Sequence, residues 1–194
     1  MVEFASVVRE NIKEVKVIID AGSSNARDLL YLSAELISVK SPGCRAIAIE
    51  AREDVQALLP VEMVKVVLSN KDGWGDFHIN PNHTEGSSIF KKPSVGYQSE
   101  KRETKRMDTL LKELGIDRVD VMKLDVEGAS LPVLQGMGEY IKTLQALHVE
   151  TELQNFWDDS PLEPDVFRYL SENGMKKVLY QMFENQSDSV WIRK

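Results

Sequence analysis

The sequence contains one cysteine, Cys44, in 194 residues, which rules out a disulfide within the chain. A reducing compartment is the usual setting for a protein with so little cysteine, and we expect this one in the cytoplasm. No apolar run approaches the length that crosses a bilayer, and the N-terminus lacks the pattern of a signal peptide. The sequence therefore predicts no membrane span.

Positive charge is also scarce: 24 lysines and arginines stand against 31 aspartates and glutamates, which gives a formal net charge of −7. Proteins that capture nucleic acid rely on basic surfaces, so we expect no nucleic acid partner. What is present is the 42% hydrophobic and 28% charged composition of an ordinary globular protein. The length predicts one domain over 1–194, while the sequence gives no indication of the oligomeric state.

Short apolar runs alternate with helical patterns along most of the chain. Strands are predicted at 15–20, 45–50, 64–68, 119–125 and 144–150. Helices are predicted within 1–14, at 24–39, 53–59 and 108–114, from about 129, and from about 163 to 173. Strands that alternate with helices favour βαβ units, so the predicted fold class is α/β with a mostly parallel sheet.

Two regions depart from this alternation. Residues 72–106 are predicted to form an insertion, with a hairpin strand at 76–80 and a long polar loop at 81–99. The chain closes with apolar segments at 176–183 and 189–193, which are joined by a short connection. Strands so close in sequence need no crossover helix, and we therefore expect a C-terminal antiparallel hairpin.

Four predicted parallel strands finish in an acidic residue, at Asp20, Glu50, Asp125 and Glu150. The carboxyl ends of parallel strands meet at one edge of a sheet, which is where ligands bind in open α/β sheets. After Asp125 the chain continues through Glu127 to a glycine, so two carboxylates follow one buried strand. Buried acids are costly unless they meet solvent, a partner or a ligand, and this edge is therefore the predicted site.

The loop after the first strand argues against a dinucleotide. A nicotinamide-binding fingerprint starting at Gly22 requires glycines at positions 24 and 27, where this chain has Ser24 and Arg27. Gly22 still permits a close approach of the backbone, and Ser23, Ser24 or Asn25 can cap the next helix.

The spacing of Asp20, Gly22 and Ala26 instead suits a ligand that carries a carboxylate and an amine. Glu50 stands where an acid holds ribose hydroxyls in nucleotide-binding folds. Together with the terminal hairpin, these features indicate a methyltransferase that uses S-adenosylmethionine.

Several motifs, in order, resemble the FkbM-type methyltransferase family. The most specific is Val-Met-Lys-Leu-Asp-Val-Glu-Gly-Ala at 121–129, followed by Val-Leu-Gln-Gly at 133–136. The other matching segments are 18–22, 47–50, 67–73, 86–89, 106–110 and 148–150. The resemblance extends over 15–174 and implies a class I methyltransferase fold, a Rossmann-like three-layer sandwich with a seven-stranded sheet. The chain departs from the family pattern at Ala26, where a glycine is usual.

The resemblance also implies S-adenosylmethionine as the cofactor and O-methylation of a sugar or a small natural product. The cofactor-binding residues implied in this way are Asp20, Gly22, Ser23, Ser24, Asn25, Glu50, Ser69, Asn70 and Asp125. Glu50 would hold the ribose, and Ser69 or Asn70 would lie near the adenine. Asp125 would face the methionine amine or the transferring methyl group.

Methyl transfer to an alcohol requires orientation of the acceptor and removal of its proton. The candidate catalytic residues are Glu127, Asp125 and Glu150, with Glu127 favoured as the general base. An equally weighted alternative is that Glu127 caps the helix beginning near residue 129. A divalent metal on these three acids and Glu152 is a less favoured alternative, so no metal ligand is assigned.

Four residues are candidates for the acceptor side of the site: His83, Ser87, Ser88 and Trp157. Each has a plainer interpretation, as a solvated loop residue, a turn residue or a core aromatic. The leading functional hypothesis is O-methylation of a carbohydrate or small-molecule hydroxyl. The alternatives are a non-catalytic module that binds the cofactor or a protein partner, and a nicotinamide oxidoreductase, which Ser24 and Arg27 disfavour.

Overall fold

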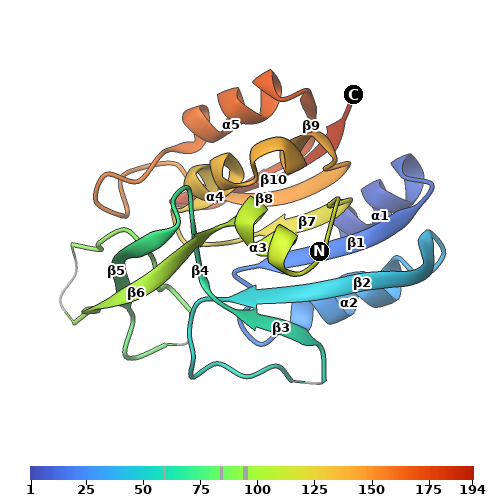
Figure 1. The fold of residues 1–194 in the computed structure, drawn as a ribbon. Coiled ribbons are helices and arrows are strands. Elements are labelled where there is room, and N and C mark those ends of the chain that lie inside the picture. The colour runs from blue at the N-terminus through green and yellow to red at the C-terminus, as the bar shows by residue number, and fades with distance from the viewer. Residues whose placement is uncertain (59, 84, 94–95) are drawn as a thin grey trace.

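The computed structural model describes residues 1–58, 60–83, 85–93 and 96–194. Seven strands form one sheet in the order β3-β2-β1-β7-β8-β10-β9 (Figure 1). They are β1 (Val15–Ala21), β2 (Lys40–Glu50), β3 (Glu62–Lys65), β7 (Val121–Leu124), β8 (Ala146–Glu152), β9 (Met175–Met182) and β10 (Gln186–Arg193). Only β10 pairs antiparallel, with β8 and β9. The predicted mostly parallel sheet with an antiparallel C-terminal hairpin is confirmed.

Helices cover both faces of this sheet, as a three-layer sandwich requires (Figure 1). Side chains of a strand alternate between faces, so Ile18 of β1 packs with Phe4 and Leu29, whereas Ile19 packs with Leu111 and others on the opposite face. The first face carries α1 (Val2–Asn11) and α2 (Arg27–Glu35). The second carries α3 (Met107–Glu113), α4 (Ser130–Gly136), the 3-10 helix η1 (Gly138–Lys142) and α5 (Glu163–Glu172).

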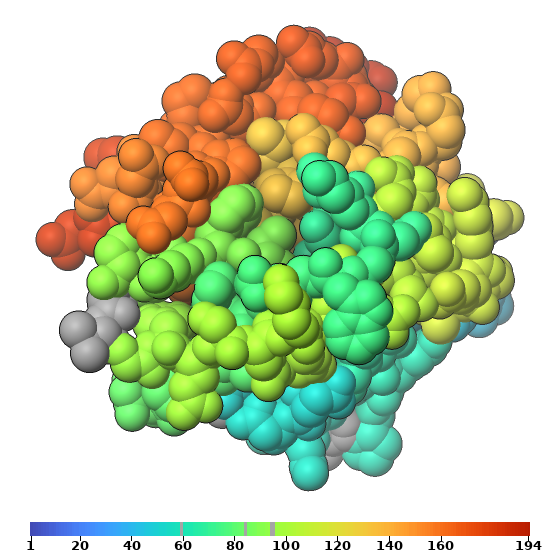
Figure 2. Space-filling view, turned by 60° about the vertical axis from the view of Figure 1, so that its left-hand side comes forward, coloured from blue at the N-terminus to red at the C-terminus, as the bar shows by residue number. Residues whose placement is uncertain are grey.

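A second sheet of three strands lies beside the ends of the main one, in the order β4-β6-β5 (Figure 1). Its strands are β4 (Val67–Ser69), β5 (Gly73–Ile79) and β6 (Gln98–Arg106). The antiparallel β5–β6 pair is the predicted central hairpin. In the space-filling view the green segment that joins these strands lies against the orange segment near residue 158 (Figure 2), where the Asp158 amide donates 2.7 Å to the Lys91 carbonyl.

The predicted helix at 53–59 is wrong for the residues that the structure describes, since 53–54 form a turn and 55–58 form neither helix nor strand. The carbonyls of Arg52 and Val55 accept hydrogen bonds from the Lys65 ammonium and so bond outside their own segment. Leu59, the last residue of that prediction, lies outside the described residues, as do Thr84, Ser94 and Val95 of the predicted long loop.

The third predicted strand, 64–68, is divided between the two sheets. β3 ends at Lys65 in the main sheet and β4 begins at Val67 in the second one. Between them the Val66 amide donates 3.1 Å to the Glu50 carbonyl, which holds the crossover against the end of β2. None of the helices within the described ranges is both long and apolar enough to span a bilayer. The domain boundary 1–194 stays a prediction.

Candidate active site at the carboxyl ends of the strands

A cavity of about 540 Å³ opens where β1, β2, β7 and β8 end. The segment 85–89, from the connection between β5 and β6, forms another part of its wall. The predicted site residues that line it are Gly22, Ser23, Ser24, Asn25, Glu50, Ser87, Ser88, Asp125, Glu127 and Glu150. Thus six of the nine cofactor candidates and the candidate base face one space.

Three predicted cofactor residues do not line the cavity. Asp20 is fully buried behind it, with neither carboxylate oxygen hydrogen-bonded. The Ser69 carbonyl faces Gly136, where a Cβ atom would come within 2.4 Å. The Asn70 amide donates 3.2 Å to Gln135 on the exposed side of α4. Leu68, one residue earlier, lies in the cavity wall instead.

Two predicted acceptor-side residues also lie outside the cavity lining. The backbone carbonyl of His83 accepts a 2.6 Å hydrogen bond from Arg52. Trp157 is fully buried, and its ring packs so closely on Gly128 that a Cβ atom there would lie 2.7 Å from it. The core position of Trp157 matches its plainer interpretation, and it explains why a glycine follows Glu127.

The loop after β1 is held against the loop after β7. Gly22 has φ +76°, and a Cβ atom on it would lie 1.6 Å from the Asp125 carbonyl oxygen. Only glycine permits this approach. Asn25 Oδ1 accepts a 3.2 Å hydrogen bond from Arg27 at the start of α2. The buried hydroxyl of Ser23 lines the cavity and has no partner within the described residues, so it is available to a ligand.

Glu50 is oriented before any ligand binds. Its Oε2 accepts from the Ser24 amide at 2.7 Å, and its Oε1 accepts from the Arg52 amide at 2.8 Å. Burial raises the pKa of Glu50, and these two amides oppose that rise. A fixed carboxylate with remaining lone pairs toward the cavity is suited to accept hydrogen bonds from a pair of hydroxyls.

Lys123 of β7 is a buried cation among the acids at the carboxyl ends of the strands. Its Nζ lies 3.0 Å from Asp125, 3.3 Å from Asp28 and 3.8 Å from Asp20. Burial alone would lower the pKa of Lys123, but the three carboxylates raise it above its ordinary value. Burial raises the pKa of Asp20 to about 6, against the attraction of Lys123. The ammonium group therefore compensates acids that the fold has removed from water.

Glu127 occupies a left-handed backbone conformation, φ +52°, at the turn after β7. Its Oε1 accepts a 3.1 Å hydrogen bond from the Gly86 amide, and its carbonyl accepts from the Ser88 hydroxyl at 2.6 Å. Burial, followed by the negative charges of Asp125 and Glu152, raises the pKa of Glu127 to about 7. A carboxyl group with that pKa can accept a proton near neutral pH.

The helix-cap alternative for Glu127 is not what the structure shows. The N-cap residue of α4 is Ala129, and this helix end has no side-chain cap hydrogen bond. The Glu127 carboxylate is bonded instead to Gly86, on the opposite wall of the cavity.

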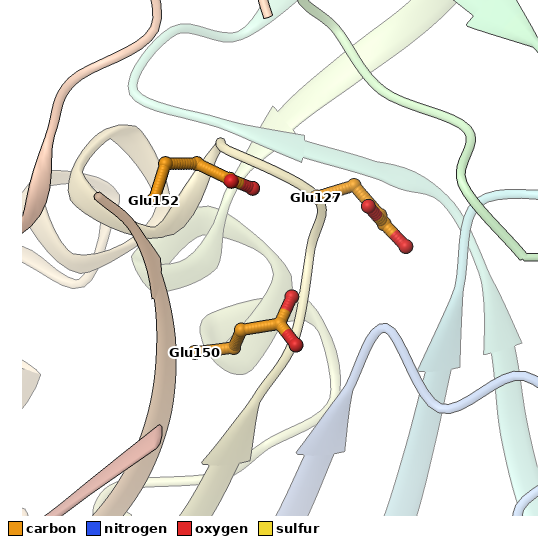
Figure 3. A group of neighbouring side chains, drawn as sticks. All are labelled: Glu127, Glu150 and Glu152. Carbon is orange, nitrogen blue, oxygen red and sulfur yellow. The ribbon is translucent and has the colours of Figure 1, made fainter. Parts of the chain in front are cut away.

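Glu150 and Glu152 lie near Glu127 (Figure 3), on the strand β8 that pairs with β10. The Gln186 amide donates to both carboxylates, at 2.8 Å and 3.2 Å, and the Trp157 indole donates 3.2 Å to Glu152. Burial and the neighbouring acids Asp125 and Glu127 raise the pKa of Glu150 well above its ordinary value. Retained protons therefore relieve part of the repulsion within this group.

A single cation could also contact these acids, because Glu127, Glu150 and Glu152 each offer an oxygen within 4.8 Å of the others. The donors from Gln186 and Trp157, however, already bond to oxygens of Glu150 and Glu152. These hydrogen bonds satisfy one oxygen of each of these two acids, whereas the buried Oε2 of Glu152 has no partner within the described residues. A metal stays the less favoured alternative and is left to experiment.

Sequence reasoning missed Arg52, Lys123 and Gln186. Lys123 carried a signal, since it is the one charged residue within the apolar strand 121–124. Arg52 follows Glu50 by two residues but gave no signal of its own, because its contacts across the cavity wall, with Asn80 and Ser87, lie 28 and 35 residues further along the chain. Gln186 reaches the acids from β10 only through the antiparallel pairing with β8.

Comparison with known proteins agrees with this geometry. A family model described as the methyltransferase FkbM domain matches residues 21–177. The chain is 28% identical over 164 residues to the 2-O-methyltransferase NoeI of Sinorhizobium fredii (strain NBRC 101917 / NGR234), with 73% of this chain and 65% of that protein covered. The chain thus spans just under two thirds of that relative's length.

Two solved structures share the fold. The N-terminal domain of EvdMO1, crystallised in the presence of S-adenosylhomocysteine (SAH) and D-fucose, matches with a TM-score of 0.52 at 12% identity, over 99% of this chain and 81% of that chain. Magnesium protoporphyrin IX methyltransferase (ChlM) from Synechocystis PCC 6803 with bound SAH matches with a TM-score of 0.54 at 10% identity, over 100% and 81%. These likenesses confirm the predicted fold class.

Proposed function

We propose, since this chain belongs to the FkbM methyltransferase domain family, that it transfers a methyl group from S-adenosylmethionine to a hydroxyl group of a carbohydrate or small metabolite. One observation carries the proposal. A single cavity has the oriented carboxylate of Glu50 on one wall and the carboxyl group of Glu127, with its pKa near 7, on another. The first suits a ribose, and the second suits an alcohol that must lose its proton.

The residues on the β1 and β2 side fit the cofactor. Glu50 would accept hydrogen bonds from the ribose hydroxyls, and the unpartnered Ser23 hydroxyl lies in the same wall. The backbone of 22–25 would hold the methionine part, beside Asp125 and its carbonyl contact with Gly22. When bound, S-adenosylmethionine supplies an electrophilic methyl group on a sulfonium centre.

Glu127 would act on the acceptor. Its Oε1 is held by the Gly86 amide, and within the described residues no hydrogen-bond donor reaches its Oε2. This oxygen is therefore available to bind an acceptor hydroxyl and take its proton. General-base assistance of this kind contributes about 100- to 10,000-fold to a rate, and orientation of the acceptor contributes the rest.

The acceptor side is rich in hydrogen-bonding groups, as a carbohydrate requires. Ser87, Ser88, Glu150 and Gln186 line the cavity together with Glu127. The relative named as a 2-O-methyltransferase supports transfer to oxygen. We therefore propose an acceptor that presents several hydroxyl groups, with the methylated one placed against Glu127.

The test combines calorimetry with a transfer assay. SAH is titrated into the protein, and methyl transfer from labelled S-adenosylmethionine is measured against mono- and oligosaccharides and small polyols. We expect SAH to bind and at least one acceptor to be methylated, with the rate reduced at least 100-fold in Glu127→Gln. Glu139→Gln, an exposed acid far from the cavity, is the matched control.

Absence of SAH binding would refute the proposed function. Binding of SAH without transfer to any hydroxyl acceptor would instead favour the alternative of a non-catalytic cofactor-binding module.

A further inference from the structure

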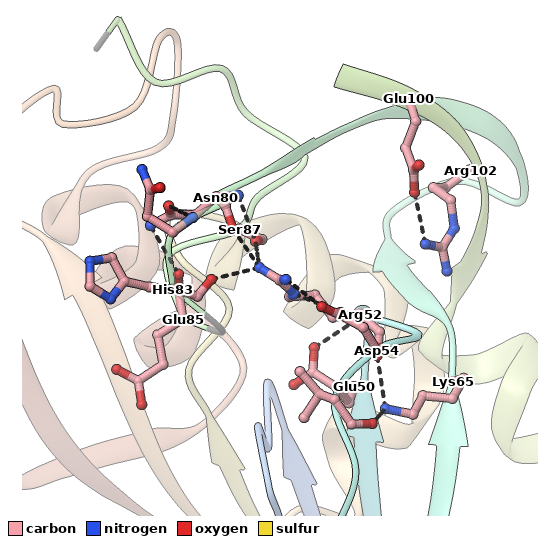
Figure 4. Close-up of polar contacts among 12 residues, drawn as sticks. Glu50, Arg52, Asp54, Lys65, Asn80, His83, Glu85, Ser87, Glu100 and Arg102 are labelled. Carbon is pink, nitrogen blue, oxygen red and sulfur yellow. Dashed lines mark hydrogen bonds and ion pairs between the residues drawn. The ribbon is translucent and has the colours of Figure 1, made fainter. Parts of the chain in front are cut away.

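Arg52 lies between the cofactor side and the acceptor side of the cavity. Its side chain is only 8% exposed, although it follows the end of β2 in a surface turn. Its backbone amide donates 2.8 Å to Glu50, and its carbonyl accepts 2.8 Å from Lys65 (Figure 4). The backbone of Arg52 is therefore part of the wall that orients the candidate ribose acid.

The guanidinium group of Arg52 extends away from Glu50 to the segment 80–83 and 85–88, which we name the acceptor-side loop (Figure 4). Its Nη1 donates to the carbonyls of Asn80 at 2.7 Å and His83 at 2.6 Å, and lies 3.4 Å from the Ser87 hydroxyl. Its Nε and Nη2 donate to both oxygens of Asp54, at 2.9 Å and 2.6 Å. One side chain thus holds two segments together.

The acceptor-side loop is in turn bonded to the candidate base. The Gly86 amide donates to Glu127 Oε1, and the Ser88 hydroxyl donates to the Glu127 carbonyl. The backbone of Ser88 also pairs with His78 of β5, at 2.7 Å and 3.0 Å. Hydrogen bonds from Arg52 to Glu50 and to the loop, and from the loop to Glu127, therefore connect the two acids through the loop backbone.

We propose that Arg52 is a positioning residue that holds the acceptor-side loop on Glu127 and so couples occupancy of the cofactor site to the geometry of the acceptor site. This inference rests on the proposed function. Arg52 lines part of the cavity, but its guanidinium donates to Asp54 and to the loop carbonyls, so we assign it no ligand contact and a role through Gly86 and Ser88.

The contacts require arginine. A planar guanidinium can donate to Asp54 along one edge while another nitrogen donates to two loop carbonyls, whereas a lysine ammonium is a single point of donation. Arg52→Lys therefore keeps the charge but cannot keep both sets of contacts. The amide bond to Glu50 is made by the backbone and survives the substitution.

Arg102 provides the matched control (Figure 4). It donates 3.1 Å to the carbonyl of Ala51 and pairs with Glu53 at 2.7 Å, so it holds the same turn after β2. Its hydrogen bonds do not reach the acceptor-side loop within the described residues. General loosening of the turn should thus affect Arg102→Lys and Arg52→Lys alike, whereas loss of the coupling should affect only the second.

The experiment measures amide hydrogen exchange at Gly86 and Ser88 by NMR, with and without SAH, together with the SAH dissociation constant from calorimetry. In the wild type we expect SAH to slow exchange at both amides. In Arg52→Lys we expect exchange at Gly86 at least tenfold faster and no slowing by SAH, with the dissociation constant changed less than threefold. Arg102→Lys should behave as the wild type does.

The pKa of Glu127 provides a second measurement, which distinguishes positioning of this carboxyl group from a general structural role of Arg52. Loss of the Gly86 donor should move the ¹³C-detected titration midpoint of the Glu127 carboxyl group to higher pH in Arg52→Lys, but not in Arg102→Lys. Once an acceptor is known, KM for it should rise at least tenfold while the SAH dissociation constant is unchanged. Asp54→Asn, an exposed change that loosens the same guanidinium group, covers the case in which Arg52→Lys fails to fold.

The outcomes separate this inference from the function on which it rests. If SAH fails to bind the wild type, the proposed function is refuted. If SAH binds but Gly86 exchange in Arg52→Lys and Asp54→Asn stays within twofold of the wild type, the positioning role is refuted. An equal change in Arg102→Lys would also overturn it, because the effect would then belong to the turn as a whole.

Discussion

The Gly86 amide donates 3.1 Å to Oε1 of Glu127, which lies in the turn after β7 on the other side of the cavity. The contact fixes one oxygen of the candidate base and favours its charged form, whereas burial and nearby acids favour the protonated form. The balance raises the pKa of Glu127 to about 7.

That pKa predicts the pH dependence of methyl transfer. A general base must be ionised, so kcat/KM should fall as pH decreases through about 7, with a slope approaching one proton. The measurement is kcat/KM for a fixed acceptor from pH 5 to pH 9. The acidic limb should be absent in the residual activity of Glu127→Gln. A profile that is flat between pH 6 and pH 8 would contradict the role of Glu127 as base.

The same raised pKa predicts that the free energy of unfolding decreases as pH rises. The folded protein binds the Glu127 proton more tightly than the unfolded chain does, because the folded pKa is about 7 and the ordinary value is 4.5. The resulting stabilisation is fully present below about pH 4.5 and is lost as pH rises through 7. Glu127→Gln should therefore stabilise the protein at pH 8, by roughly 2 kcal/mol, and less at pH 5.5. Thermal unfolding at both pH values measures this difference. An equal change in Tm at the two pH values would contradict the argument.

Glu50 should control cofactor affinity. In Glu50→Gln an amide nitrogen must replace one of the oxygens that accept from Ser24 and Arg52, so one backbone donor loses its partner. We expect the SAH dissociation constant to rise at least tenfold in calorimetry. Glu62→Gln on the edge strand β3, which does not line the cavity, should leave SAH binding unchanged.

Lys123 should be essential for stability. Lys123→Met leaves the buried carboxylate of Asp20 without its cation, and breaking a buried pair in this way costs about 3–5 kcal/mol. Denaturant unfolding followed by circular dichroism measures the loss. The double variant Lys123→Met, Asp20→Asn should recover part of it, because the uncompensated charge is then removed. A single variant as stable as the wild type would contradict this account.

Chelation provides a test of the metal alternative. Because Gln186 and Trp157 donate to Glu150 and Glu152, we expect dialysis against EDTA to leave both SAH affinity and methyl transfer unchanged within twofold. Recovery of a lost activity by Mg²⁺ or Mn²⁺ would show that these acids hold a cation. The measurement should be repeated with Gln186→Ala, in which one of the donors is missing.

The sequence alone determined the parallel sheet, its antiparallel terminal hairpin and the edge at which the acids gather. Strand periodicity and the rule that parallel strands end together are local or topological, so they do not depend on packing detail. Glu50, Asp125, Glu127 and Glu150 were identified in this way, and the structure places all four on one cavity. The helix expected at 53–59 does not form, and the carbonyls of Arg52 and Val55 bond instead to Lys65, a contact that periodicity does not record.

Only the tertiary structure decided what surrounds those acids. Gly86 lies 41 residues from Glu127, and Ser87 lies 35 residues from Arg52, so no local pattern links them. The roles of Lys123 and Gln186 likewise arise from neighbouring strands of the assembled sheet. The pKa of Glu127 depends on burial and on charges brought together by folding, which no local pattern records. The sequence therefore left this residue as a base or a helix cap; the folded chain shows no side-chain cap on α4, and the role as base stays a proposal.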